Sequence, residues 1–439
     1  MYRPKKLTQV VALAAAGTLV LTACGGGDGG DDKKSSSSNN ASSGTQLYFV
    51  DGNTADYSKD FDKGTLEGVR ATYPGAELKD DFKQRLLGVN PKLTEFTYGP
   101  ESYDATVVLA LAASAAKNDS GKAIAQKMQE VTVGGEKCTT FKDCLAMIDK
   151  GTDIDYDGVS GPIDFNSTGS PSAATIGIFQ YGADNTFTAQ DYVTGQIPDV
   201  DSVAANQKVS GPIPKGDGTL TIGSLLPQSG DLAFLGPPEF AGVDLAVKEI
   251  NAAGGVLGKP VKHIKADSGD GTPNIAPSET DQLLSGGADA IVGAASSSVS
   301  LSVIDRIVNA GVVEVSPANT STAFDTYPDK GLYFRTAPSD VLQGTVMAQT
   351  VKGDGYQNIA ILARQEAYGE ALAKQVRKVF EEEGGKVVSY QLYDPNAANF
   401  TAEVDSLKAQ DPDAIVVIAF DETKKIIPAL IKVGMGQKH

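Results

Sequence analysis

The order of the secondary-structure elements most constrains what this chain can fold into. One half has the start of a domain but not its end, and the other half has the end but not the start. Residues 218–439 open like a complete β/α domain and break off after a helix, at His439. Residues 45–193 do the reverse: they start abruptly on the apolar strand 46–50 and finish like the end of a domain. Joining His439 to Thr45 would give one continuous fold. The sequence therefore predicts a single α/β fold in circularly permuted order.

Apolar strands alternate with amphipathic helices from Thr219 onward. We expect strands at 220–223, 261–266, 290–293, 312–315, 358–363, 386–392 and 414–419, and helices at 240–253, 275–284, 301–309, 342–350, 370–383, 401–409 and 423–433. The earlier half adds helices at 80–87, 102–116, 123–130 and 141–150, and a last strand at 174–181. This alternation indicates parallel sheets covered on both faces. The alternation predicts a further strand after helix 423–433, and strand 46–50 would take that position in the sheet.

The first residues have the pattern of an export signal. Basic residues at positions 3, 5 and 6 precede an apolar run, 10–21, that is too short for an ordinary transmembrane helix. The run ends in Leu-Thr-Ala-Cys, which is similar to a bacterial lipobox, so we expect a lipoprotein signal peptide at 1–23 and lipidation of Cys24. An uncleaved signal anchor and a simple secretory signal are the alternatives.

The residues after the signal form an expected tether. Residues 24–44 are mostly Gly, Ser, Asn, Asp and Lys, a composition typical of a flexible linker. Two acyl chains on Cys24 would hold the protein stably at a membrane. We therefore expect it to be lipid-anchored on the extracytoplasmic face of the cell membrane.

The two remaining cysteines, Cys138 and Cys144, lie in one short stretch, KCTTFKDC. An oxidising compartment favours a disulfide between them. Zinc is the rival, but His263 and His439 are the only histidines and neither lies nearby in the sequence. We expect the disulfide and no metal.

Charge and motifs disfavour two classes of function. A net charge of -17 argues against a nucleic-acid partner, because phosphate binding needs clustered Lys and Arg. The chain has only 2 His, no GxSxG elbow and no Walker-type phosphate loop. We therefore expect neither an enzyme nor a bound cofactor.

Several segments carry a resemblance to one family. They are TIGSLLPQSGDLAFLG, EFAGVDLAVKEINAAGGVLGKPV, DAIVGAASSSVS, VSPANTST, AILARQEAYGEALA, YFVDGN and GVSGPIDF. Read from Gly218 to His439 and on from Thr45, the chain resembles type I periplasmic binding proteins of the branched-chain amino acid (Leu/Ile/Val) class. The resemblance implies two lobes, each a mainly parallel sheet flanked by helices, with a ligand cleft between them. The rotated order is the one large departure.

The resemblance also implies how the chain is divided. Residues 45–195 match the C-terminal part of the family's binding domain, 196–216 form a linker, and 217–439 match its N-terminal part. Lobe 1 would comprise about 217–337 plus 79–166, and lobe 2 about 338–439 plus 45–78 and 167–195. Hinge crossovers would lie near 335–340, 71–78 and 165–172.

An amino acid ligand needs hydrogen-bond donors for its carboxylate. Hydroxyl and backbone N–H groups at a strand end that leads into a helix N-terminus suit this purpose. GAASSSVS, residues 293–300, is such a place. By the resemblance, Ser296 donates to the carboxylate with Ser297 nearby, and Ala318 and Thr320 make a second contact. A serine run here could also be plain N-capping.

The ligand ammonium needs an anionic acceptor, because a desolvated charge without a partner is costly. By the resemblance, Asp51 is this acceptor, and Tyr368 closes over the ligand from the second lobe. Phe420 and Leu235 match positions that meet the ligand side chain. The alternatives are a turn role for Asp51 and core packing for the two aromatic residues.

An acidic stretch gives one further candidate. Residues 153–158, with Asp164 at the twelfth place, copy the spacing of a calcium loop. The twelfth residue is not the usual Glu, and GVSGPIDF matches the family's crossover strand instead of a helix. We expect a structural acidic turn, with calcium as the alternative.

The resemblance implies a substrate-binding protein of an ABC transporter. Such a protein closes on a branched-chain or related amino acid, docks on a permease, and works as a monomer. The alternative is a sensory or regulatory lipoprotein that binds amino acids or short amides without a transport role.

Overall fold

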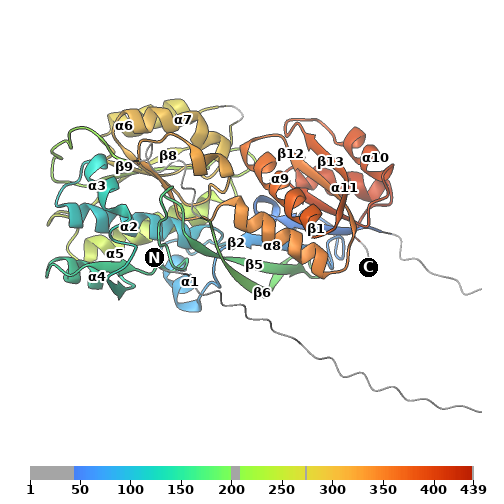
Figure 1. Ribbon diagram of the computed structural model, residues 1–439, viewed down its shortest axis with the longest axis horizontal. Coiled ribbons are helices and arrows are strands. Elements are labelled where there is room, and N and C mark those ends of the chain that lie inside the picture. Colours follow the sequence, from blue (N-terminus) through green and yellow to red (C-terminus); the bar gives the residue numbers. More distant parts are fainter. Residues whose placement is uncertain (1–43, 199–207, 272–273, 438–439) are drawn as a thin grey trace, which may run out of the picture. The chain divides into compact units, whose positions relative to one another are not determined.

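The structure, a computed structural model, describes residues 44–198, 208–271 and 274–437 (Figure 1). The predictions for the signal peptide, Cys24, most of the tether and His439 lie outside these residues, as does the middle of the 196–216 linker. No helix within the described ranges is both long and apolar enough to cross a membrane.

The larger sheet has seven strands in the order β13-β12-β14-β1-β2-β5-β6. Its strands are β1 (Gln46–Val50), β2 (Arg70–Pro74), β5 (Ala173–Tyr181), β6 (Phe187–Gln196), β12 (Asn358–Arg364), β13 (Lys386–Tyr393) and β14 (Ala414–Ile418). The pairs from β13 to β2 are parallel, whereas β5 and β6 are antiparallel to their neighbours. Helices α8 (Asp340–Gly353), α9 (Ala367–Glu382), α10 (Thr401–Lys408) and α11 (Thr423–Lys432) accompany this sheet.

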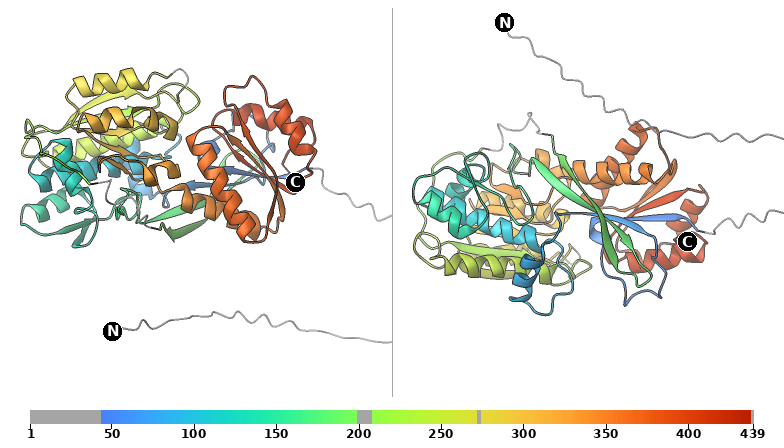
Figure 2. Two further views of the ribbon diagram at one scale, coloured as in Figure 1. Left: turned by 45° about the horizontal axis from the view of Figure 1, so that its top comes forward. Right: turned by 90° about the horizontal axis from the view of Figure 1, so that it is seen from below.

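Strand β1 lies inside the larger sheet, between β14 and β2 (Figure 2). Its register pairs Leu47 with Ile415 and Phe49 with Val417, so the predicted pairing of strand 46–50 with the later half is confirmed. All three apolar side chains at 47–49 are fully buried. The backbone N–H of Thr45 donates to the carbonyl of Gly436 at 2.9 Å. The start of one half thus meets the end of the other within one sheet.

The smaller sheet is wholly parallel, in the order β11-β10-β9-β7-β8. Its strands are β7 (Thr221–Leu226), β8 (Lys262–Asp267), β9 (Ala290–Gly293), β10 (Val313–Ser316) and β11 (Tyr333–Arg335). The helices around it are α1 (Asp80–Leu87), α2 (Gly99–Ala116), α3 (Gly121–Met128), α4 (Phe141–Ile148), α5 (Gly236–Ala252), α6 (Ala276–Ser285) and α7 (Ser297–Asn309). Two of these, α2 and α5, pack together although they come from different halves of the chain. A shared core of Val107, Ile222 and Val243 joins the halves here.

The predicted α/β class with mainly parallel sheets is confirmed, and one prediction of detail is wrong. We expected 174–181 to be the last strand of the earlier half, yet β6 follows it as an antiparallel edge strand. The β6 sequence, FTAQDYVTGQ, is polar and its residues are largely exposed. An edge strand with little apolar character leaves almost no hydrophobic pattern to detect. The chain crosses from the elements of one sheet to those of the other at four places. One is the linker between β6 and β7, and the others lie before α1, before β5 and before α8.

Cys138, Cys144 and the acidic stretch lie together at the small sheet of β3 (Glu136–Cys138) and β4 (Ile154–Tyr156). Cys138 and Cys144 are joined in a disulfide. The ammonium of Lys137 lies 3.0 Å from a carboxylate oxygen of Asp155 and 2.9 Å from one of Asp157. Two of the acids with the calcium-loop spacing therefore already form ion pairs with one lysine.

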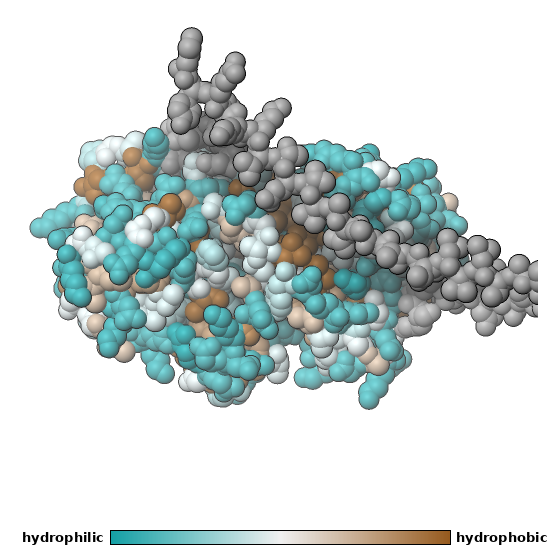
Figure 3. All heavy atoms as spheres, turned by 60° about the horizontal axis from the view of Figure 1, so that its bottom comes forward, coloured by the Kyte–Doolittle hydropathy of each residue, from teal (hydrophilic) through white to brown (hydrophobic). Residues whose placement is uncertain are grey.

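The face of the molecule drawn in Figure 3 is mostly hydrophilic, with apolar residues in small separate patches. In the described part of the chain, the exposed large apolar side chains are Val133, Ile213, Leu257 and Ile431, which lie far apart in the sequence. We therefore look for an apolar ligand site in a cavity and not on the surface.

Candidate functional site

A small cavity of about 20 Å³, close to the space of one water molecule, gathers residues that follow strands of both sheets or lie in the helices beside them. It is lined by Asp51, Gly52, Tyr98, Leu232, Leu235, Ala295, Ser296, Ser297, Ala318, Tyr368 and Phe420. Seven of these residues were predicted as ligand-binding: Asp51, Leu235, Ser296, Ser297, Ala318, Tyr368 and Phe420. The eighth, Thr320, is fully buried and is not part of the lining. Its backbone carbonyl accepts from the N–H of Asp340 at 2.7 Å, and its buried hydroxyl has no hydrogen-bond partner among the described residues.

One wall of the cavity is built for an anion. Ser296 is the N-cap of α7, with its hydroxyl oxygen 3.5 Å from the N–H of Val299. The N-terminus of a helix this long carries partial positive charge and free N–H groups. The amide of Asn319 donates to the carbonyls of Ala294 and Ala295, at 3.1 Å and 2.9 Å, and so holds the turn before the helix. This wall therefore presents hydroxyl and amide donors on a fixed backbone.

The other wall carries an acid. Asp51 directly follows β1 and adopts a left-handed backbone, with φ of 53°. Its carboxylate accepts hydrogen bonds from the hydroxyl of Tyr98 and, at 3.3 Å, from the side-chain amide of Gln343. Among the described residues it has these donors but no ion-pair partner.

Burial is the largest cause of the pKa shifts of the carboxyl groups in this wall. It raises the pKa of Asp51 to about 6, although the hydrogen bonds from Tyr98 and Gln343 oppose the shift. Burial also raises the pKa of Asp340 well above its usual range, and the charge of Asp51 adds to that shift. A cation entering the cavity would relieve the cost of the buried charge.

Aromatic and aliphatic side chains complete the cavity. The hydroxyl of Tyr368 donates to the carbonyl of Val50 at 2.9 Å and accepts from the N–H of Gly52 at 3.3 Å. Its ring stacks on Phe420, with ring centroids 5.5 Å apart. Together with Leu232 and Leu235 these rings form an apolar lining, which suits a hydrocarbon side chain.

Hydrogen bonds from α7 and from Ser321 to the start of α9 close the cleft beside the cavity. Ser298 donates to a carboxylate oxygen of Glu366 at 2.6 Å and accepts from the N–H of Ala367 at 3.1 Å. The hydroxyl of Ser321 donates to the carbonyl of Ala367 at 2.8 Å. The smaller-sheet side and the larger-sheet side are therefore held together next to the site.

Sequence reasoning missed Tyr98, Gln343 and Leu232. Tyr98 precedes the Gly-Pro start of α2, which marks a helix N-terminus but not what the tyrosine faces. Its partner, Asp51, is 47 residues away in the sequence. Only the tertiary packing of the turn after β1 against the start of α2 brings them together.

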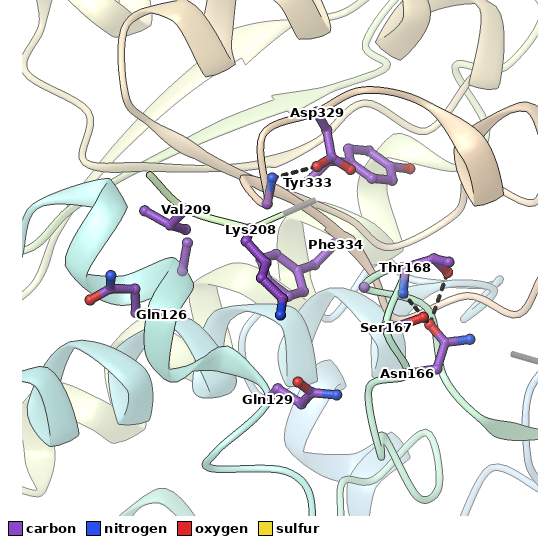
Figure 4. A pocket seen from close by; sticks show the side chains of 13 residues that line it. Gln126, Gln129, Asn166, Ser167, Thr168, Lys208, Val209, Asp329, Tyr333 and Phe334 are labelled. Carbon is purple, nitrogen blue, oxygen red and sulfur yellow. Dashed lines mark hydrogen bonds between the residues drawn. The ribbon is translucent and has the colours of Figure 1, made fainter. Parts of the chain in front are cut away.

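A second and larger cavity, of about 240 Å³, lies beside α3 and β11 (Figure 4). Its lining includes Gln126, Gln129, Asn166, Lys208, Asp329 and Phe334. None of the predicted ligand-binding residues is among the lining. The acceptor oxygens of Asn166 and Asp329 already take backbone N–H groups, from Thr168 at 2.9 Å and from Gly331 at 2.6 Å. We therefore take the smaller cavity as the candidate site.

Comparison with known proteins identifies the family of this chain. Residues 219–439 match the model of a family described as periplasmic binding protein. The Leu/Ile/Val-binding protein homolog 3 of Brucella melitensis is 31% identical over 199 residues, which are 45% of this chain and 53% of that protein. A leucine-, isoleucine-, valine-, threonine- and alanine-binding protein of Pseudomonas aeruginosa is 29% identical over 192 residues, 43% of this chain and 51% of that protein.

A third relative has a different role in its name. The chemotactic signal transduction system substrate-binding protein BasB of Halobacterium salinarum is 32% identical over 211 residues, 45% of this chain and 49% of that protein. The chain spans about half the length of the curated relatives it matches. Asp51 and Tyr98 lie outside the residues that match the family model.

Proposed function

The chain belongs to the periplasmic binding protein family, in its branched-chain amino acid class, and on this basis we propose that it binds a branched-chain or related amino acid for uptake. In this proposal it is the monomeric, extracytoplasmic substrate-binding protein of an ABC transporter and delivers its ligand to the permease. Lipid attachment at Cys24 is part of the proposal and rests on the lipobox-like sequence.

The placement of opposite polar groups around one apolar cavity carries this proposal. The carboxylate of Asp51 lines the cavity together with the serines at the N-terminus of α7. An α-amino acid has its ammonium, its carboxylate and its side chain on one carbon. It would enter when the contacts of Ser298 and Ser321 with Ala367 open, because the closed cavity has room for about one water molecule. Asp51 would accept from the ammonium, Ser296 and Ser297 would donate to the carboxylate, and Ala318 would add a backbone contact. Tyr368, Phe420 and Leu235 would enclose the side chain, with Thr320 supporting the wall next to Ala318.

A thermal-shift screen over the common amino acids tests the function. A ligand at 100 times its dissociation constant should stabilise the protein by about 2.7 kcal/mol, enough to raise the melting temperature by several degrees. Leucine, isoleucine or valine should give the largest shift. No shift with any amino acid would contradict the proposal.

A sensory role is the second candidate, and the resemblance to the chemotactic protein of Halobacterium salinarum favours it. Both roles use the same ligand site. Uptake of labelled ligand in cells lacking the gene separates them: a transport protein is required for uptake, whereas a sensor is required only for the response to the ligand.

Affinity should fall in acid, because the ligand ammonium needs the ionised form of Asp51. The pKa of this carboxyl is raised to about 6 in the free protein, so affinity should be level above pH 7. Each pH unit below that pKa should weaken binding by about tenfold, since a proton then competes with the ligand. The stability of the free protein responds in the opposite sense, because protonation removes a buried charge. Calorimetric titration at pH 7.5 and pH 5 checks this, and equal affinity at both would contradict it.

We also propose that the fold is circularly permuted relative to its relatives. The parallel placement of β1 between β14 and β2, and the bond from Thr45 to Gly436, support this. A variant that begins at Asp217, joins Gln437 to Thr45 through a short Gly-Ser connector and ends at Ile197 should fold. Its ligand affinity should stay within about threefold of the original, since no cavity residue changes. A variant that remains unfolded, or folds without binding, would contradict the permutation.

A further inference from the structure

Arg364, at the end of β12, lies against the cavity wall without lining the cavity. Its guanidinium carbon is 3.4 Å from the centroid of the Phe420 ring, and its side chain is buried. Phe420 in turn stacks on Tyr368. Arg364 therefore supports both aromatic residues that enclose the proposed ligand.

Glu422 fixes the position of Arg364. Its carboxylate accepts from one guanidinium nitrogen of Arg364, at 2.9 Å and 3.2 Å, and from the hydroxyl of Tyr393 at 2.8 Å. It also accepts from the backbone N–H of Phe420 at 3.0 Å. One buried carboxylate thus holds the backbone of Phe420 and the cation that lies on its ring.

The same arginine reaches the closed rim of the cleft. Its Nε lies 3.5 Å from a carboxylate oxygen of Glu366, the N-cap of α9. The other oxygen of Glu366 accepts from Ser298. Arg364 therefore links the cavity wall to the contact that joins the two sides of the cleft.

A buried ion pair is a poor source of stability, because desolvation offsets most of the attraction between the charges. A flat guanidinium that both stacks and forms hydrogen bonds does, however, hold an aromatic ring in one orientation. We propose that Arg364 is a positioning residue that sets which ligand side chains fit, by holding Phe420 as a rigid wall of the cavity. This inference rests on the proposed amino acid binding.

The substitution Arg364→Lys tests it, because lysine keeps the charge next to Glu422 and loses the flat stacking surface. The measurement is the ratio of dissociation constants for L-phenylalanine and L-leucine, by calorimetry. Wild type should prefer leucine, and Arg364→Lys should lower that preference by about fivefold as the ring becomes free to move. The variant Glu422→Gln, which frees the same arginine, should change the ratio in the same direction.

Arg377→Lys is the matched control. Arg377 lies 5.6 Å from the Tyr390 ring centroid and pairs with Glu381 at 3.1 Å, on the exposed side of α9. Its substitution should leave the ratio unchanged. If Arg364→Lys and Glu422→Gln lower the melting temperature and leave the ratio unchanged, Arg364 has only a structural role and the inference is wrong. Absence of amino acid binding by the wild type would instead overturn the proposed function.

Discussion

Asp51→Asn is expected to weaken amino acid binding by about 100-fold or more while leaving the free protein at least as stable as the wild type. Loss of binding follows because the ligand ammonium would be buried without a charged acceptor. Asparagine keeps the shape of the side chain and tolerates the left-handed backbone at this position, so the fold should not suffer.

The expected stability of Asp51→Asn follows from the raised pKa of Asp51 in the protein without ligand. A pKa raised to about 6 means that the buried charge of Asp51 costs at most about 3 kcal/mol of stability at pH 7. Removing the charge removes that cost. Calorimetric titration and thermal unfolding of the same variant measure both effects, with Asp56→Asn, which removes an exposed acid nearby, as the control. Unchanged affinity in Asp51→Asn would exclude Asp51 from the site, and a large loss of stability would contradict the account of its pKa.

Gly52→Ala is expected to weaken binding more than tenfold and to lower the free energy of unfolding by about 1–3 kcal/mol. A methyl group at Gly52 would lie 2.5 Å from the Cδ1 atom of Phe420 and 3.1 Å from the carbonyl of Ala419. Arg364 lies against the Phe420 ring, so the ring cannot easily retreat on that side. The Phe420 ring must therefore move into the cavity, or its contact with the new methyl group stays strained.

Gly353→Ala provides the comparison for this substitution. A methyl group there meets no heavy atom within 4 Å, at the end of α8. The control should bind the ligand like the wild type and unfold at a similar or higher temperature. Wild-type affinity in Gly52→Ala would show that the Phe420 ring is free to move, against the account of a rigid wall.

The sequence was sufficient to place the elements that bury apolar side chains. The strand at 46–50 could be assigned to the later sheet because four apolar or β-forming residues, 47–50, without a local partner must find a buried place. The polar edge strand β6 lacked such a pattern and was missed. Hydrophobic periodicity therefore predicted the interior of each sheet better than its edge.

Some residues of the candidate site could likewise be predicted from the sequence, and others could not. Seven residues predicted from the resemblance line one cavity. Tyr98 and Gln343, which bind Asp51, come from helices at distant sequence positions, and no local pattern links them. The same holds for Arg364 and Glu422, 58 residues apart. Partners of a buried charge are fixed by tertiary packing, so they became visible only in the structure.

Titration of the protein with L-leucine and its two truncated analogues tests the central claim most directly. Isocaproate keeps the carboxylate and side chain but lacks the ammonium, and isoamylamine lacks the carboxylate. If Asp51 and the α7 N-terminus bind the two charged groups of one amino acid, leucine should bind and each analogue should be weaker by about 100-fold or more. Isocaproate binding as tightly as leucine, or no heat from leucine, isoleucine and valine alike, would contradict it.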